Sequence, residues 1–323
     1  MLIILFNSVL AQYIVKRDRV SLMMASLLLS IFLFSHIFSM IGDPVFLHNP
    51  KKAKKVALIQ GDVPRGSIFG YKERLDKRID RYIGLSEEVR GSEADLVVWP
   101  EFTFPIDVMK EFPKKMEPVI DEIKKTKAFF IIGSLLTEQD KEQHDYNSAL
   151  VFGRDGELED IYYSQEPTIF NENISSKDNH GKLYLDNMGI TLCWEEIDEK
   201  IFREYVSNGA EYFVSLSSNT DLDYSWFKRY ASFFSRARAA ESMRYLARTT
   251  QTGITQIINP FGKIVQRLPS NCSTFLIAEA FSVRQITFYS RYGDIVTKIL
   301  VIFMILCVFV EKLWKKWRAK LRV

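Results

Sequence analysis

Short apolar runs alternate with amphipathic segments along the middle of the chain, from about residue 55 to residue 280. The run at 56–60 has the length and composition of a buried strand. Leu75, Ile79 and Ile83 recur at helical spacing among charged residues, which indicates an amphipathic helix. The whole pattern predicts strands over 56–60, 95–99, 129–133, 148–152, 158–163, 188–194, 212–216, 255–259 and 264–265, and helices over 71–90, 116–126, 199–207 and 230–245.

Strands separated by both helices and hairpins are typical of a mixed sheet with helices on its outer face, and two such sheets could stack. The predicted fold class is therefore α/β. A composition of 47% hydrophobic and 26% charged residues is that of a globular chain and excludes disorder. The net charge of +3 is too small to indicate a nucleic-acid partner.

Residues 20–41 contain no charged side chain. As a helix this stretch is long enough to cross a hydrocarbon core of about 30 Å. A signal peptide is the competing interpretation, but no clear small-residue cleavage site follows. The basic run at 16–19 precedes the stretch, so the positive-inside bias places the following domain outside the cytoplasm. We therefore expect an N-terminal membrane segment over 1–44 with one span.

A second transmembrane helix is expected over 295–314, where Lys298 would extend its side chain to the membrane surface. The strongly basic tail at 315–323 would then lie in the cytoplasm. Both spans place the middle of the chain on the far side of the membrane. Residues 2–15 form a further apolar stretch that is short for a span and could be half of a hairpin, an interfacial segment or a remnant of a longer membrane region.

Two reactive residues are predicted to follow strands. Cys193 follows a short apolar run, where a thiol is well placed as a nucleophile next to backbone N–H groups that hold an oxyanion. Glu101 follows the strand at 95–99, beside an aromatic residue, where a carboxylate suits a general base. The alternatives are a buried structural cysteine and a surface glutamate. The three cysteines and four histidines show no metal-ligand spacing, so no metal and no cofactor is expected.

A set of short motifs occurs in a fixed order along the chain. Trp99-Pro100-Glu101 and Leu192-Cys193-Trp194-Glu195 contain the two reactive residues. The others are 56–64 with Phe69, 146–149, 218–219, 226–227, 238–241, 252–255 and 288–294. Together they resemble the nitrilase (carbon-nitrogen hydrolase) superfamily and, within it, the bacterial apolipoprotein N-acyltransferases.

That resemblance implies a four-layer α-β-β-α sandwich over residues 55–285, flanked by transmembrane helices and anchored in the bacterial inner membrane with the catalytic domain on the periplasmic side. It implies a Glu–Lys–Cys triad in which Cys193 takes an acyl chain from a phospholipid as a thioester and Glu101 is the base. The amine of a diacylated lipoprotein would accept the chain. The residues expected to support the site are Ser164, Glu172, Trp194, Glu195 and Phe69.

The chain departs from the family pattern in two ways. Aligning Phe170 and Glu172 with the family places Ser164 where the catalytic lysine belongs, and a hydroxyl cannot replace an ammonium. Lys177 or Lys182 could reach in from the following loop, although no spacing argument supports either. The family also has several N-terminal membrane helices where this chain has one convincing span. Two alternatives therefore stay open: a membrane-tethered amidase, and a catalytically impaired relative that binds lipid or lipoprotein.

Overall fold

The computed structural model describes residues 2–17, 21–33, 51–63, 71–139, 143–166, 174–177, 181–220 and 225–299, together with single positions between 301 and 317. Contacts within the chain divide it into two units. One unit consists of Met1–Asn49 and Tyr292–Val323, and the other is Pro50–Arg291.

The larger unit contains two sheets. The first has the order β12 (Thr274–Ser282), β1 (Lys51–Gln60), β2 (Leu96–Phe104), β3 (Phe129–Gln139), β4 (Gln143–Phe152) and β5 (Leu158–Tyr163), with β6 (Ile174–Ser175) beside β4. β1, β2 and β3 are parallel, and β3, β4 and β5 are antiparallel. The central parallel strand β2 is almost completely buried, as expected for a strand covered on both faces.

The second sheet has the order β11 (Ile264–Arg267), β10 (Gln256–Ile258), β9 (Tyr245–Thr250), β8 (Tyr212–Ser217) and β7 (Met188–Leu192). β7, β8 and β9 are parallel and in register, so their carboxyl ends meet at one edge of the sheet. Every residue of these three strands is buried. This edge is where the thiol described below lies.

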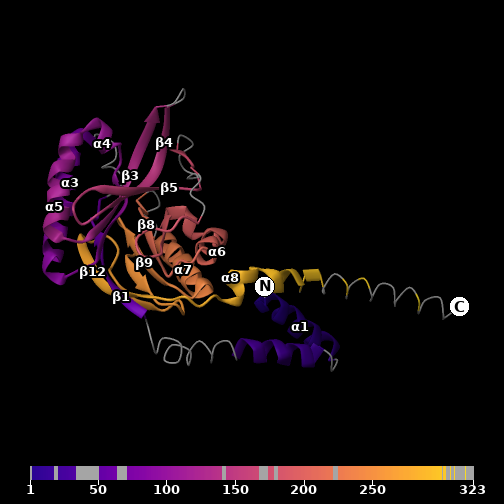
Figure 1. Cartoon of the computed structure of the whole chain (residues 1–323). Coiled ribbons are helices and arrows are strands. Elements are labelled where there is room, and N and C mark those ends of the chain that lie inside the picture. The colour runs from indigo at the N-terminus through magenta and orange to yellow at the C-terminus, as the bar shows by residue number, and fades with distance from the viewer. Residues whose placement is uncertain are drawn as a thin grey trace. The chain divides into compact units, whose positions relative to one another are not determined.

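The two sheets stack face to face, with β1 and β2 of the first against β8 and β9 of the second. Figure 1 shows α3 (Tyr71–Val89) and α5 (Glu117–Thr126) outside the first sheet, and α6 (Glu199–Ser207) and α7 (Ser225–Ser242) beside the second. The unit is therefore a helix–sheet–sheet–helix arrangement. The remaining short helices of this unit are η2 (Arg90–Ser92), α4 (Val108–Glu111), η3 (Pro113–Met116) and η4 (Cys193–Glu196), and α8 (Phe288–Tyr292) follows the last strand.

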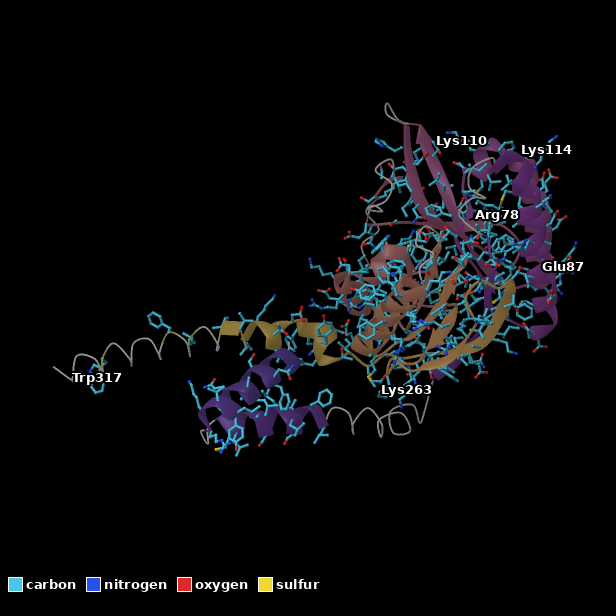
Figure 2. All side chains as sticks on the ribbon, turned by 180° about the vertical axis from the view of Figure 1, so that it is seen from behind. Arg78, Glu87, Lys110, Lys114, Lys263 and Trp317 are labelled. Carbon is cyan, nitrogen blue, oxygen red and sulfur yellow. The ribbon has the colours of Figure 1, made fainter. Side chains whose placement is uncertain are left out.

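The helices over the first sheet are amphipathic, as their sequence predicts. Ile79 and Tyr82 of α3 are buried against Trp99 of β2 in one apolar core. Figure 2 shows Glu87 and Lys114 at the outer surface of this layer, where both side chains are exposed. Apolar burial on one face and solvated charge on the other fix the position of the helix against the sheet.

The predicted order of elements is largely correct. The helices expected over 71–90, 116–126 and 199–207 and the hairpin strands are present, but β9 and β12 were not predicted. The helix expected over 230–245 begins earlier, at Ser225. It ends at Ser242 because Met243 takes a left-handed backbone conformation. The strand expected over 188–194 ends at Leu192 for the same reason, since Cys193 has a φ of 48°.

In the smaller unit, α1 (Leu2–Lys16) covers the first apolar stretch, and residues 21–33 and 295–299 are also helical. None of the helices in the part of the chain that the structure describes is both long and apolar enough to cross a membrane. Much of the span predicted over 20–41 and most of the basic tail at 315–323 lie outside the described residues.

Candidate active site

Cys193 lies at the tight turn between β7 and the 3₁₀ helix η4. Its φ of 48° is unusual for a residue with a side chain, and such strained positions cluster at functional sites. The thiol is half-buried and lies next to Ser217, the last residue of β8, whose Oγ is 3.8 Å from the sulfur. The parallel pairing of β7 with β8 produces this neighbourhood, because Leu192 pairs with Leu216.

Glu101 lies in β2 of the other sheet and is 1% exposed. Its Oε1 accepts a hydrogen bond from Asn147 Nδ2 at 2.7 Å, and its backbone carbonyl accepts one from Gln251 Nε2 at 3.1 Å. Gly133 of β3 lies directly against it: a Cβ at this glycine would be 2.6 Å from Glu101 Cα. Asn147 therefore holds the carboxylate, while Gln251 and Gly133 hold the backbone of Glu101.

A buried arginine supports the backbone next to Glu101. Phe102 has a φ of 52°, and its carbonyl accepts a hydrogen bond from Arg78 Nη1 at 2.8 Å. Burial lowers the pKa of Arg78. Figure 2 shows Arg78 further inside the molecule than Glu87 of the same helix. A left-handed residue persists only where its surroundings hold it, so α3 helps to aim Glu101.

The structure brings Glu101 and Cys193 together from the two facing sheets. Burial raises the pKa of the Cys193 thiol well above its ordinary value, and the negative charge of Glu101 and a hydrogen bond to it raise that pKa further. The hydrogen bond from Ser217 acts in the opposite direction. A protonated thiol beside a buried carboxylate is the arrangement from which the carboxylate can accept the proton.

Glu195 is fully buried and lies behind Cys193 in a network of four donors. Its Oε2 accepts hydrogen bonds from Tyr162 Oη and the backbone N–H of Leu192, each at 2.6 Å. Its Oε1 accepts from the N–H of Gln165 at 2.6 Å and from Ser164 Oγ at 3.0 Å. Burial raises the pKa of Glu195 to about 7, although these donors lower it. Glu195 thus ties β7 and the Ser164 segment together beside the thiol.

Trp194 forms part of a pocket at the thiol. Its ring lies 5.8 Å from the ring of Phe227, centroid to centroid. The pocket is lined by Cys193, Trp194, Ile197, Phe227, Tyr230 and Phe234, among others. The aromatic side chains of α7 thus give the thiol an apolar neighbourhood on one side.

The two lysines considered as replacements at the Ser164 position are paired elsewhere. Lys177 Nζ donates to Glu138 at 2.7 Å, and Lys182 Nζ donates to Asp160 at 2.6 Å. Phe69 and Glu172, the other two residues expected to support the site, lie outside the described residues. In the described part of the chain, no group of three or more His, Cys, Asp or Glu side chains could hold a metal ion.

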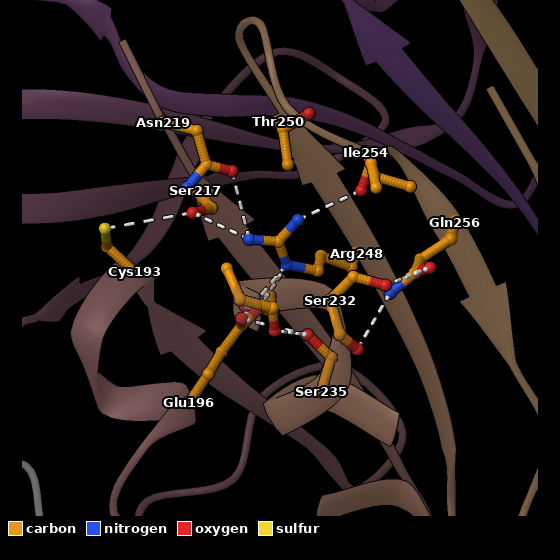
Figure 3. A network of polar contacts seen from close by, with 12 residues as sticks. Cys193, Glu196, Ser217, Asn219, Ser232, Ser235, Arg248, Thr250, Ile254 and Gln256 are labelled. Carbon is orange, nitrogen blue, oxygen red and sulfur yellow. Dashed lines mark hydrogen bonds and ion pairs between the residues drawn. The ribbon is translucent and has the colours of Figure 1, made fainter. Parts of the chain in front are cut away.

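The sequence interpretation missed a buried ion pair beside the thiol, formed by Arg248 of β9 and Glu196 of η4 (Figure 3). Arg248 Nε lies 2.8 Å from Glu196 Oε1, and both side chains are almost completely inaccessible to solvent. The signal was present: an arginine within a run of otherwise uncharged residues needs a buried partner. It was overlooked because the strand that carries it was not predicted.

Comparison with known proteins gives a family match over most of the chain. The family model described as carbon-nitrogen hydrolase matches residues 55–283. The apolipoprotein N-acyltransferases of Wigglesworthia glossinidia brevipalpis and Vibrio parahaemolyticus are each 25% identical, over 81% and 76% of this chain. These matches cover 56% and 53% of the two relatives, so the chain spans about half the length of the curated relatives it matches.

Solved structures share the fold. A carbon-nitrogen hydrolase from Helicobacter pylori G27 superposes with a TM-score of 0.57 at 17% identity, covering 71% of this chain and 89% of that one. These values establish a common architecture of two sheets and helices.

Proposed function

Because this chain belongs to the carbon-nitrogen hydrolase family, we propose that it is a membrane-bound acyltransferase of lipoprotein maturation. The donor is a phospholipid, and the acceptor is the N-terminal diacylglyceryl-cysteine of an apolipoprotein. The similarity to apolipoprotein N-acyltransferases supports this substrate class. The observation that carries the proposal is the meeting of a half-buried thiol and a buried carboxylate, Cys193 and Glu101, beside an apolar pocket.

The reaction proceeds in two steps through Cys193. Glu101 accepts the thiol proton, the sulfur attacks an ester carbonyl of the phospholipid, and the lysophospholipid leaves with that proton as a thioester forms. The amine of the acceptor then attacks the thioester. An amide bond forms, the carbon–sulfur bond breaks, and the amine proton passes through Glu101 to restore the thiol.

The aromatic wall of the pocket supports a hydrocarbon substrate. Phe227, Tyr230 and Phe234 of α7 lie near the sulfur and offer apolar surface to an acyl chain. Transmembrane helices over 20–41 and 295–314 would anchor the protein in the bacterial inner membrane, with the larger unit on the periplasmic side. The basic runs in the sequence support this topology.

One observation favours a second candidate, a relative that binds lipid or lipoprotein without transferring the acyl chain. The Ser164 hydroxyl, at the position where the family has a lysine, donates to Glu195 at 3.0 Å. Loss of one oxyanion donor typically lowers a rate by about a hundred- to a thousand-fold. A protein with this defect could keep the pocket and lose turnover.

The test is acyl-enzyme formation by the full chain in detergent. The protein is incubated with a phospholipid carrying a labelled acyl chain, and the adduct is located by mass spectrometry. We expect a hydroxylamine-sensitive adduct on Cys193 that is absent from Cys193→Ala. Adding a diacylated lipopeptide should then move the label to the peptide amine.

The other outcomes identify the alternatives. An adduct that water releases at the same rate with and without the lipopeptide would identify a thioesterase or amidase. Lipid binding without any adduct on Cys193 would identify the non-catalytic relative and would refute the transferase proposal.

A further inference from the structure

Three side chains from three neighbouring parallel strands meet at the carboxyl edge of the second sheet. Cys193 follows β7, Ser217 ends β8, and Arg248 lies in β9. Figure 3 shows Ser217 between the sulfur of Cys193 and the guanidinium of Arg248. The Ser217 Oγ lies 3.8 Å from Cys193 Sγ and 3.1 Å from Arg248 Nη2.

The guanidinium is held on three sides. Its Nε donates to both carboxylate oxygens of Glu196, at 2.8 and 3.0 Å. Its Nη1 donates to the carbonyl of Ile254 at 3.0 Å, and its Nη2 donates to Ser217 Oγ and to Asn219 Oδ1, at 3.1 and 3.2 Å. A planar group with donors in this fixed fork has a single orientation.

The carboxylate of Glu196 is also held by hydrogen bonds from other residues. It accepts a hydrogen bond from Ser235 Oγ of α7 at 2.9 Å and another from Ser215 Oγ of β8. A buried ion pair of this kind is weak evidence for stability alone, because desolvation offsets the attraction of the charges. Its arginine is linked to the thiol by two successive hydrogen bonds through Ser217, which calls for a role in the site.

The direction of each hydrogen bond between Arg248, Ser217 and Cys193 indicates what the ion pair does in the site. Arg248 has no acceptor, so at the Arg248–Ser217 contact the serine oxygen accepts and the arginine donates. The only hydrogen of the Ser217 hydroxyl is then available to the sulfur of Cys193. We propose that Ser217 is a catalytic residue that donates a hydrogen bond to the Cys193 thiolate, and that Arg248, locked by Glu196, is the positioning residue that aims it.

This inference rests on the proposed function, in which Cys193 is the nucleophile. A donor to the sulfur stabilises the thiolate relative to the thiol and therefore lowers the thiol pKa. It partly opposes Glu101 of β2 and Glu196 of η4, whose negative charges raise the same pKa. Arg248 of β9, the cation that faces Ser217, is paired with Glu196. The chain thus brings a cation close to the nucleophile from β9, although Ser164 stands where the family has its lysine.

The test measures the thiol directly and needs no lipid. The full chain in detergent is alkylated with iodoacetamide across a pH series, and the rate at Cys193 is followed by mass spectrometry. Ser217→Ala should raise the apparent pKa of Cys193 by about 1 unit, which lowers the alkylation rate about tenfold at a fixed pH below that pKa. Ser217→Thr keeps the hydroxyl and should restore a profile close to that of the wild type.

A matched control removes a buried hydroxyl elsewhere. Ser148 is fully buried and donates to the carbonyl of Ser134 at 2.7 Å. Ser148→Ala should leave the Cys193 profile unchanged. An unshifted profile for Ser217→Ala, or a threonine variant that behaves like alanine, would refute the role of Ser217.

The role of Arg248 is tested by non-additivity. The neutral pair Arg248→Gln with Glu196→Gln removes the aim of Ser217 and also a negative charge that raises the pKa of Cys193, so the measurement compares Ser217→Ala with and without the pair. In the background of the pair, Ser217→Ala should no longer raise the apparent pKa of Cys193. If this pair does not fold, as judged by circular dichroism, Arg248→Lys takes its place, since a lysine keeps the charge but loses the fork. Shifts that simply add would overturn the positioning role. The alkylation profiles need no lipid. They therefore test Ser217 and Arg248 even if the acyl-enzyme does not form, and a failure of the proposed function can be told apart from a failure of this inference.

Discussion

The surroundings of Cys193 favour the protonated form of its thiol. Burial and the charge of Glu101 raise the pKa of the thiol, and a protonated thiol is a poor nucleophile. The same carboxylate that suppresses the resting thiolate can accept the proton when the sulfur attacks. If Glu101 is the base, as we propose, it has opposite effects on the reactivity of the resting thiol and on acyl-enzyme formation, and substitution of Glu101 separates the two.

Glu101→Gln removes a negative charge next to the sulfur and should lower the pKa of Cys193. We expect alkylation of Cys193 by iodoacetamide near pH 7.5 to become several-fold faster, while acyl-enzyme formation falls about a hundredfold or more because the base is lost. The half-buried Cys272 is the internal control, and its alkylation rate should not change. Slower alkylation of Cys193 in this variant would mean that Glu101 activates the resting thiol.

Among the elements, β3 contacts the strand that carries Glu101 through Gly133, where the register of the β2–β3 pairing shifts. Gly133 of β3 has no room for a side chain: a Cβ there would lie 2.3 Å from the carbonyl oxygen of Pro100 and 2.6 Å from Glu101 Cα. Both neighbouring atoms belong to strand backbone, which cannot move aside without changing the sheet. The glycine therefore determines how closely the strand carrying Glu101 can approach β3.

Gly133→Ala should push β2 away from β3. We expect the free energy of unfolding to fall by about 1–3 kcal/mol and acyl-enzyme formation to fall about a hundredfold, because Glu101 is displaced from the thiol. Thermal unfolding and the labelled-lipid assay measure the two effects. Gly84→Ala on α3, where a Cβ meets nothing within 4 Å, should instead leave acylation unchanged and stabilise by about 0.4–1 kcal/mol. Equal behaviour of the two variants would contradict this account.

At the scale of the whole larger unit, the site exists only while the two sheets keep their relative position. Thr249 of β9 donates to the carbonyl of Ile59 at 2.6 Å across the sheet interface. Gln251 follows β9 and bridges the sheets as well, by donating to the Glu101 carbonyl and accepting from the Tyr82 hydroxyl. Cross-sheet hydrogen bonds therefore set the distance between the thiol and the carboxylate.

Comparison of Gln251→Leu with Thr249→Val should separate a loss of stability from a loss of alignment between Glu101 and Cys193. Gln251→Leu removes a buried partner from two polar groups, so we expect a loss of about 1–3 kcal/mol in stability together with slower acyl-enzyme formation. Thr249→Val, which loses one cross-sheet hydrogen bond away from Glu101, should cost about 1 kcal/mol with acylation close to that of the wild type. Thermal unfolding and labelled-lipid acylation give both readings. A Gln251 variant that is destabilised but acylated normally would place the alignment elsewhere.

The sequence by itself determined most of the elements and which two strands lead to the reactive residues, but not where those strands end. Apolar periodicity is local, and it predicted α3, α5, α6 and the first hairpin because each buries one face or one run of its own residues. It also placed Cys193 at the end of β7, whereas Glu101, expected after a strand ending at residue 99, lies within β2, which continues to Phe104. Their catalytic roles remain predictions.

Only the tertiary structure decided which polar residues act together. β9 escaped prediction because Arg248 interrupts its apolar run, and that charge is tolerated only through a partner, Glu196, that lies 52 positions earlier in the chain. The alignment of β7, β8 and β9 brings Cys193, Ser217 and Arg248 to one edge, and the stacking of the sheets brings Glu101 to the sulfur. Hydrogen bonds and ion pairs depend on distance in space, and no local pattern of hydrophobic and polar residues encodes that distance.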